Sequence, residues 1–308
     1  MVKDSVYADQ SLQVFEPKHK SEFGPMLIGF QPRVSRVWPE GRYLDSLSDL
    51  ANKYNAVLIV PNGGRDGEFE NEEDYDFLAR SVKALLVEFR LDPTRIFAVG
   101  LNEGADDAIQ FCLKRPEVIS GAILIDPTLS GQKHVFNFKE NAVGKKFLFI
   151  HYFKNFPRNR MRPLVEMLQH NHANVRFEVV KPMTKKFSFG NTHSRFIEKL
   201  DWILEQDYWG IKAENEENEA LNVFVYNVLS REIPMGGKLT IDLTSGRPGA
   251  MLIQIIDQDD RIRFEEVYYF VFGKRYVVIT PPKLDQGHYI LRLNCPLGVV
   301  EESFQVKG

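Results

Sequence analysis

The sequence is poor in several features that would point to a function class at once. It has only two cysteines, Cys112 and Cys295, and no Cys-x-x-Cys spacing. A disulfide is therefore possible but not implied, and we expect two separate buried thiols. No spacing of His, Asp or Glu supports a metal site, so we expect neither a metal nor a cofactor.

An excess of charge of one sign is also missing, because 39 basic residues stand against 42 acidic ones. The short basic clusters at Lys145-Lys146, Lys185-Lys186 and 158–162 are read as solvated surface charge. We therefore expect no nucleic-acid partner. No apolar run approaches the ~20 residues that a bilayer span requires, so no transmembrane segment is expected.

No signal peptide is visible at Met1. The protein is expected to be secreted or at the cell surface if a signal peptide has been removed, and cytoplasmic otherwise. Apolar residues are plentiful: they make up 44% of the 308 residues, which is enough for a sizeable core.

Residues 1–206 alternate short apolar runs with amphipathic segments. This alternation predicts a doubly wound, mostly parallel α/β sheet. Strands are expected at 12–15, 25–30, 56–60, 95–99, 122–125, 146–150 and 175–180. Helices are expected at 43–54, 73–89, 103–114, 161–170 and 193–205.

Composition then shifts at an acidic run, which predicts an exposed linker over 207–219. Residues 220–308 lose helical periodicity and are expected to form a small all-β sandwich domain. Its strands are expected at 221–228, 238–243, 250–256, 268–272, 276–280 and 289–293. Tyr289 and its alternating aliphatic neighbours are read as a half-buried edge hairpin.

The motif with the clearest chemical meaning is Gly100-Leu101-Asn102-Glu103-Gly104, between an expected strand and an expected helix. This is the frame of the Gly-x-Ser-x-Gly nucleophile elbow, in which the serine attacks a carbonyl carbon. Asn102 stands at the serine position, and a carboxamide cannot be activated as a nucleophile by a neighbouring base. In the helix that follows, Glu103, Asp106 and Asp107 are read as favourable charges at its N-terminus.

Three stretches carry a resemblance to a known family: 58–63, 74–77 and above all Leu91-Asp92-Pro93-Thr94-Arg95, which leads into the elbow. They make the first domain similar to the polyhydroxybutyrate-depolymerase and feruloyl-esterase-like branch of the α/β-hydrolases. The resemblance implies a triad at Asn102, Asn155 and His193, of which only the histidine keeps its chemistry. In this branch one strand ends in a His-Gly pair that helps form the oxyanion hole, and that pair is missing after Phe30. A second His-Gly pair precedes the triad acid; here the histidine is present as His151, but tyrosine follows it and Asn155 stands at the position of the acid.

Seven side chains are candidates to line the remnant of the active-site cleft. They are Phe30, Gln31, Asn102, Glu103, Tyr152, Phe153 and His193, although the aromatic rings of Tyr152 and Phe153 explain a filled cleft equally well. Asp126 follows an expected strand, but no neighbouring spacing supports a second hydrolytic centre there.

The C-terminal region resembles, more weakly, the C-terminal sorting domain of the type IX secretion system of Bacteroidetes-type bacteria. The matching segments are 237–243, 252–257, 284–293 and 304–306, although the usual Asn-Pro entry motif is absent. A generic immunoglobulin-like sandwich explains the same strands equally well.

Three functions remain open at this point. The first is a non-catalytic homologue that binds a protein or a small ester- or glycan-like ligand. The second is an active esterase with a non-standard nucleophile. The third is an exported interaction protein in which the hydrolase fold is only a scaffold.

Overall fold

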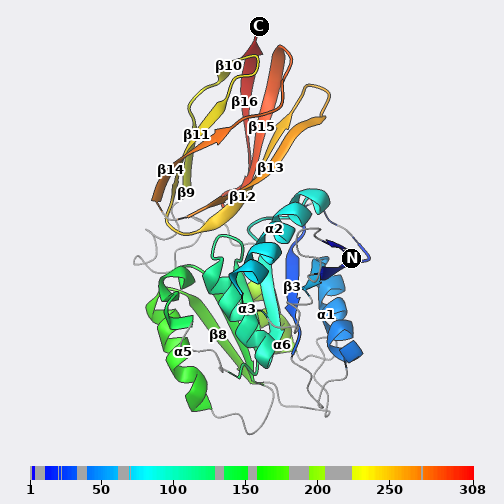
Figure 1. Cartoon of the computed structure of the whole chain (residues 1–308), viewed down its shortest axis with the longest axis vertical. Helices are drawn as coiled ribbons and strands as arrows, with labels where there is room; N and C mark the ends of the chain where they lie inside the picture. Colours follow the sequence, from blue (N-terminus) through cyan, green and yellow to red (C-terminus); the bar gives the residue numbers. More distant parts are fainter. Residues whose placement is uncertain are drawn as a thin grey trace.

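The structure is a computed structural model, shown in Figure 1. It describes residues 2–3, 11–19, 21, 23–32, 40–61, 69, 71–128, 135–151, 158–179, 194–204, 224–271 and 273–308. The predicted linker at 207–219 and both domain boundaries beside it lie outside these residues, so that division stays a prediction. We call the described part up to residue 204 the α/β region and the part from 224 the β region.

The α/β region is built on one eight-stranded sheet in the order β1-β2-β4-β3-β5-β6-β7-β8. Its strands are β1 (Val2–Lys3), β2 (Ser11–Phe15), β3 (Met26–Phe30), β4 (Val57–Pro61), β5 (Ile96–Leu101), β6 (Gly121–Ile125), β7 (Lys146–His151) and β8 (Asn174–Val179). Strands β3 to β8 run parallel, whereas β1 and β2 pair antiparallel. The expected mostly parallel, doubly wound sheet is therefore confirmed, with an antiparallel edge. The order and directions are those of the α/β-hydrolase fold.

Helices cover both faces of this sheet because successive strand residues point to opposite sides. On one side Ile28 and Ala98 pack with α2 (Glu72–Phe89), α3 (Glu103–Lys114) and α5 (Arg158–His170). On the other side Leu27 and Val99 pack with α1 (Glu40–Tyr54) and α6 (Ser194–Leu204). A short 3-10 helix, η1 (Lys139–Ala142), precedes β7. The result is a three-layer sandwich with a core on each side of the sheet.

The β region is a sandwich of a five-stranded sheet, β10-β16-β15-β12-β13, and a three-stranded sheet, β14-β11-β9. The strands are β9 (Phe224–Val228), β10 (Glu232–Pro234), β11 (Leu239–Ser245), β12 (Gly249–Ile256), β13 (Ile262–Phe270), β14 (Gly273–Ile279), β15 (Gly287–Cys295) and β16 (Gly298–Lys307). Side chains such as Ile241, Ile253 and Leu291 fill the space between the sheets. The all-β expectation is confirmed.

Two expectations about single residues need correction. The strand that carries Tyr289 is not at an edge: β15 lies between β16 and β12, and its hairpin partner is β16. Lys145 and Lys146 are not solvated surface charges either, because both side chains are buried. The cysteines behave as expected, since both are free, and burial raises the pKa of the Cys112 thiol to about 12.

The β region packs against the α/β region through the outer face of its five-stranded sheet. Ala250, Leu252 and Val267 from that face belong to the same apolar cluster as α2 and α3. Lys83 of α2 also lies 3.6 Å from Glu266 of β13. In Figure 1 the β region accordingly stands at the end of α2. No helix among the residues that the structure describes is long and apolar enough to cross a membrane.

Candidate functional site

Asn102 occupies the sharp turn between β5 and α3, with φ 53° and ψ −117°. A non-glycine residue rarely adopts this conformation, which costs about 1–3 kcal/mol. Its backbone N–H donates to the Ile125 carbonyl at 2.9 Å, and its carbonyl accepts from the Ala105 N–H at 3.0 Å. The side chain does not cap the helix. The turn thus keeps the strained geometry of an elbow that presents one side chain beyond the sheet.

The two glycines of the motif are required by close backbone contacts. A Cβ on Gly100 would lie 2.1 Å from the carbonyl oxygen of Gly104. A Cβ on Gly104 would lie 2.4 Å from the carbonyl oxygen of Phe30. The start of α3 is therefore wedged against the end of β5 and of β3, which fixes where Asn102 points.

A buried His–Asp pair lies beside this turn. His151 Nδ1 and Asp126 Oδ1 are 2.9 Å apart, and the residues are 6% and 1% exposed. Both stand at the carboxyl ends of neighbouring strands, β7 and β6, and Asp126 has a φ of 42°. When the carboxylate is ionised, Nδ1 donates the hydrogen bond, which leaves Nε2 as the basic nitrogen of a neutral ring.

Asn102, Asp126 and His151 thus lie at the carboxyl ends of three neighbouring strands, on the edge where open α/β sheets bind ligands. The Asn102 N–H bonds the last residue of β6, and the Asp126 N–H bonds Ile150 of β7 at 2.9 Å. Sequence reasoning missed the pairing of Asp126 with His151. The available signal was that each residue comes at the end of one of two adjacent parallel strands.

Carboxylates crowd the first turn of α3. Asp106 and Asp107 are buried, and Asp106 accepts a hydrogen bond from the Thr128 hydroxyl. Glu103 has a buried oxygen, Oε2, with no hydrogen-bond partner among the described residues. The helix N-terminus offsets part of the cost of burying these charges. Within the described part of the chain, no group of His, Cys, Asp and Glu is arranged to hold a metal ion.

The other predicted cleft residues fall into two groups. The ring of Phe30 is 1% exposed and lies among Phe69, Tyr75 and Phe111, with the Phe69 ring 5.2 Å away edge-on. It therefore belongs to the core beneath the turn, whereas Gln31 is half-buried. Tyr152, Phe153, Asn155 and His193 lie outside the described residues, so the assembly of a triad around Asn102 stays a prediction.

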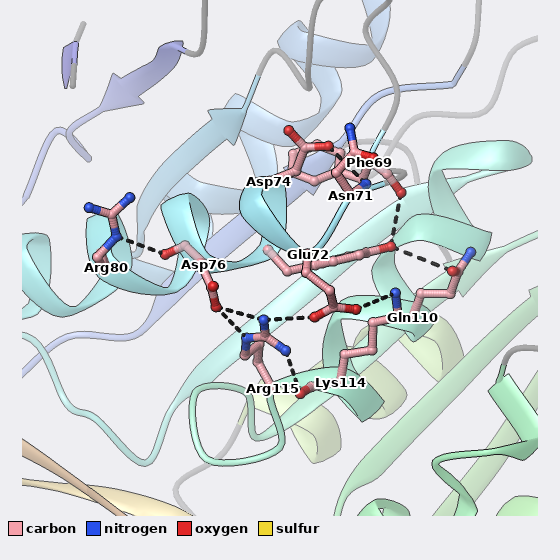
Figure 2. Close-up of polar contacts among 10 residues, drawn as sticks. Phe69, Asn71, Glu72, Asp74, Asp76, Arg80, Gln110, Lys114 and Arg115 are labelled. Atoms are coloured by element: carbon pink, nitrogen blue, oxygen red, sulfur yellow. Dashed lines mark hydrogen bonds and ion pairs between the residues drawn. The ribbon is translucent and has the colours of Figure 1, made fainter. Parts of the chain in front are cut away.

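An ion-pair network holds the elbow helix from its other end (Figure 2). Lys114 and Arg115, at the end of α3, pair with Glu72 at 3.0 and 2.9 Å, and Arg115 also pairs with Asp76 at 2.6 Å. The hydrogen bond from Lys114, and then Arg115, lowers the pKa of the Glu72 carboxyl against the opposing effect of burial. The network joins the start of α2 to the end of α3. Its exposure suits a positioning role rather than a chemical one.

The chain is similar to several solved structures at low sequence identity. No protein-family model matches the chain, and no characterised protein matches it in sequence. Among solved structures, the serine hydrolase FphF of Staphylococcus aureus has 16% identity over 64% of this chain and 92% of that one, with a TM-score of 0.48. An esterase from the fungus Rhizomucor miehei has 13% identity over 63% and 76%, with a TM-score of 0.47. The Francisella virulence factor BioJ has 14% identity over 64% and 80%, also with a TM-score of 0.47.

The strand order and the elbow turn together define a protein with the α/β-hydrolase fold, joined to an additional β region.

Proposed function

We propose that this chain is a catalytically inactive α/β-hydrolase homologue that works by binding. The observation that carries the proposal is Asn102 in the elbow conformation. The backbone holds this residue in a strained turn, yet its side chain cannot attack an acyl carbon, because the amide nitrogen lone pair is delocalised.

The predicted positions of the other triad members support the same conclusion. If Asn155 takes the place of the acid, the histidine at 193 lacks the carboxylate that orients its ring and stabilises its charge. Loss of the nucleophile or the acid alone lowers turnover by orders of magnitude. Loss of both groups leaves no simple route to an acyl-enzyme.

The chemistry left at the carboxyl edge of the sheet suits recognition. The amide of Asn102 both donates and accepts hydrogen bonds, and Glu103 brings an acceptor oxygen that lacks a partner among the described residues. Such groups suit a small ester- or glycan-like ligand or a polar protein segment. The motifs at 58–63 and 91–95 support descent from the polyhydroxybutyrate-depolymerase and feruloyl-esterase-like branch.

The test is turnover of p-nitrophenyl acetate and butyrate by the purified chain, together with labelling by a fluorophosphonate probe. We expect no saturable turnover and no label. The variant Asn102→Ser should gain slow labelling because the elbow presents its hydroxyl, whereas Asn171→Ser, which places a serine after α5, should not. Saturable hydrolysis by the wild-type protein would overturn the proposal.

One observation favours a second candidate, an active hydrolase that needs no protein nucleophile. The His151–Asp126 pair has the arrangement by which a histidine takes a proton from water. In this case the wild-type protein hydrolyses esters, His151→Gln abolishes the rate, and the fluorophosphonate probe still fails to label it. Ester turnover that survives His151→Gln excludes this candidate.

For the β region we propose a role in localisation or partner contact, either as a type IX-like sorting domain or as an immunoglobulin-like module. Its two-sheet sandwich and its terminal strand β16 support both forms. The sorting form further proposes export to the surface of a Bacteroidetes-type bacterium. Removing residues 221–308 distinguishes the two, because an unchanged cellular location contradicts the sorting role.

A further inference from the structure

A small cavity lies between the two regions, at the sheet edge opposite the elbow. On the α/β side its walls are the segments that precede β5, β6 and β7. On the other side they are residues 247–250, which lead into β12, and Pro296. We call it the junction cavity. Its volume is about 40 Å³. Since one water needs about 10–15 Å³ of such space, the cavity holds a few waters or one small ion.

Two buried cationic side chains meet at this cavity, one from each region. Lys145 is 4% exposed, and its Nζ donates to the carbonyl oxygens of Pro116 and Ile119, each at 2.6 Å. Arg247 is 6% exposed, and its Nη1 donates to the Gly144 carbonyl at 2.6 Å. Burial is the main influence that lowers the pKa of Lys145, and the nearby charge of Arg247 acts in the same direction.

Among the described residues that line the cavity, basic side chains outnumber acidic ones. Glu117 is the one acidic side chain among the described residues that line the cavity. Lys146 also contributes to the lining, but its ammonium turns away and donates to the Trp202 carbonyl at 3.1 Å. Two basic side chains therefore face one carboxylate where little water screens them, and an anion bound there would favour the charged form of Lys145.

Two neutral polar side chains in the same interface have no hydrogen-bond partner among the residues that the structure describes. The hydroxyl of Tyr269 is buried with no hydrogen bond among the described residues. Tyr269 stands opposite Ala250 of the cavity wall in the β12–β13 register, and Glu117 is close enough to raise the pKa of Tyr269, after the larger effect of burial. Asn294 of β15 is 2% exposed, and both polar atoms of its amide are likewise unbonded.

We propose that the junction cavity binds a small oxyanion, phosphate-like or carboxylate, which bridges the α/β region and the β region. Lys145 and Arg247 supply the charge, and Tyr269 supplies a neutral donor. Because the ligand takes donors from both regions, its binding stabilises their docking. The site lies beyond the amino ends of the strands and is independent of the elbow and of any activity there.

The test is calorimetric titration of the full chain with inorganic phosphate and, separately, with acetate, at constant ionic strength set by sodium chloride. Saturable binding of either supports the site: phosphate alone identifies a tetrahedral oxyanion, and acetate alone a carboxylate. Glu117→Gln removes the opposing charge and should tighten binding by on the order of tenfold. Glu198→Gln, the same change on the exposed face of α6, should leave the affinity unchanged.

A second variant covers the risk that changes at Arg247 separate the two regions. Tyr269→Phe keeps the ring in place and should weaken anion binding several-fold while the protein stays folded. Absence of saturable binding overturns the proposal. So does weaker binding in Glu117→Gln, or an equal change in Glu117→Gln and Glu198→Gln.

Discussion

The carboxyl and amino ends of the parallel strands differ in the structural features that they carry. At the carboxyl end, Asn102 occupies a strained turn with the backbone form of a hydrolase elbow. At the amino end, where hydrolase chemistry does not take place, two cations are buried and a second region is docked. With strands of five or six residues, the two ends are about 17–20 Å apart.

This distance shows what the β region can and cannot do. Its contacts run through Gly144, α2 and the segments before β5 and β6, all away from the carboxyl ends of the strands. The described part of the β region is therefore not a lid over Asn102. The elbow and the docking surface of the β region are separate, and single substitutions can perturb one without the other.

The largest effect is expected for Gly104→Ala, at the carboxyl end. The new Cβ would lie 2.4 Å from the Phe30 carbonyl and 2.6 Å from the Gln31 carbonyl, and neither backbone group can move aside cheaply. We expect a loss of at least about 3 kcal/mol of stability, seen as a large fall in the thermal midpoint.

Gly287→Ala is the matched control, because its new Cβ would meet only a Tyr289 ring carbon at 3.8 Å. Its midpoint should change little. Equal losses in the two variants mean that α3 is not wedged against β3 as the structure has it.

At the amino end, Gly144→Ala should have an intermediate effect. Gly144 has a φ of +69°, and a Cβ there would lie 2.3 Å from Cδ and Nη1 of Arg247. We expect a loss of about 2 kcal/mol, from the strained φ and the displaced guanidinium together. Limited proteolysis should show faster cleavage between the two regions.

Gly236→Ala separates these two causes. Gly236 has nearly the same φ, +71°, but nothing lies within 4 Å of its Cβ position. It should lose only about 1 kcal/mol and keep the wild-type proteolysis pattern. A Gly144→Ala protein that behaves like Gly236→Ala would show that Arg247 does not hold the regions together.

The two ends also differ in how far the sequence could predict them. The elbow was predictable because Gly100, Asn102 and Gly104 lie within five positions of one another, and one strand-to-helix turn constrains the backbone of all three. The contact of Arg247 with Gly144 joins residues 103 positions apart, and no local pattern marks it. The reading of Lys145 as a surface residue failed for the same reason, since the carbonyls that satisfy it come from 116 and 119.

The accuracy of the predicted strand ends also depends on whether local sequence or distant contacts determine the strand. Buried strands such as β6 were predicted within a residue, because continuous apolar runs mark them. The start of β13 was missed by six residues, since Arg263 and Glu265 alternate with apolar neighbours and face away from the core. The three-residue β10 was also missed, because it exists only through its parallel pairing with the chain end.

The smallest expected effect, a gain, returns to the elbow. Asn102→Gly should relieve the backbone strain at φ 53° and ψ −117° and stabilise the protein by about 1 kcal/mol.

Arg90→Gly is the comparison, because Arg90 has a similar φ, 50°, but a ψ of 56° in the ordinary left-handed region. Its gain should be smaller. A larger rise in thermal midpoint for Asn102→Gly than for Arg90→Gly means that the chain keeps a costly turn with asparagine in it, which is expected if the Asn102 side chain itself binds. Equal gains remove this argument for a binding role at the elbow.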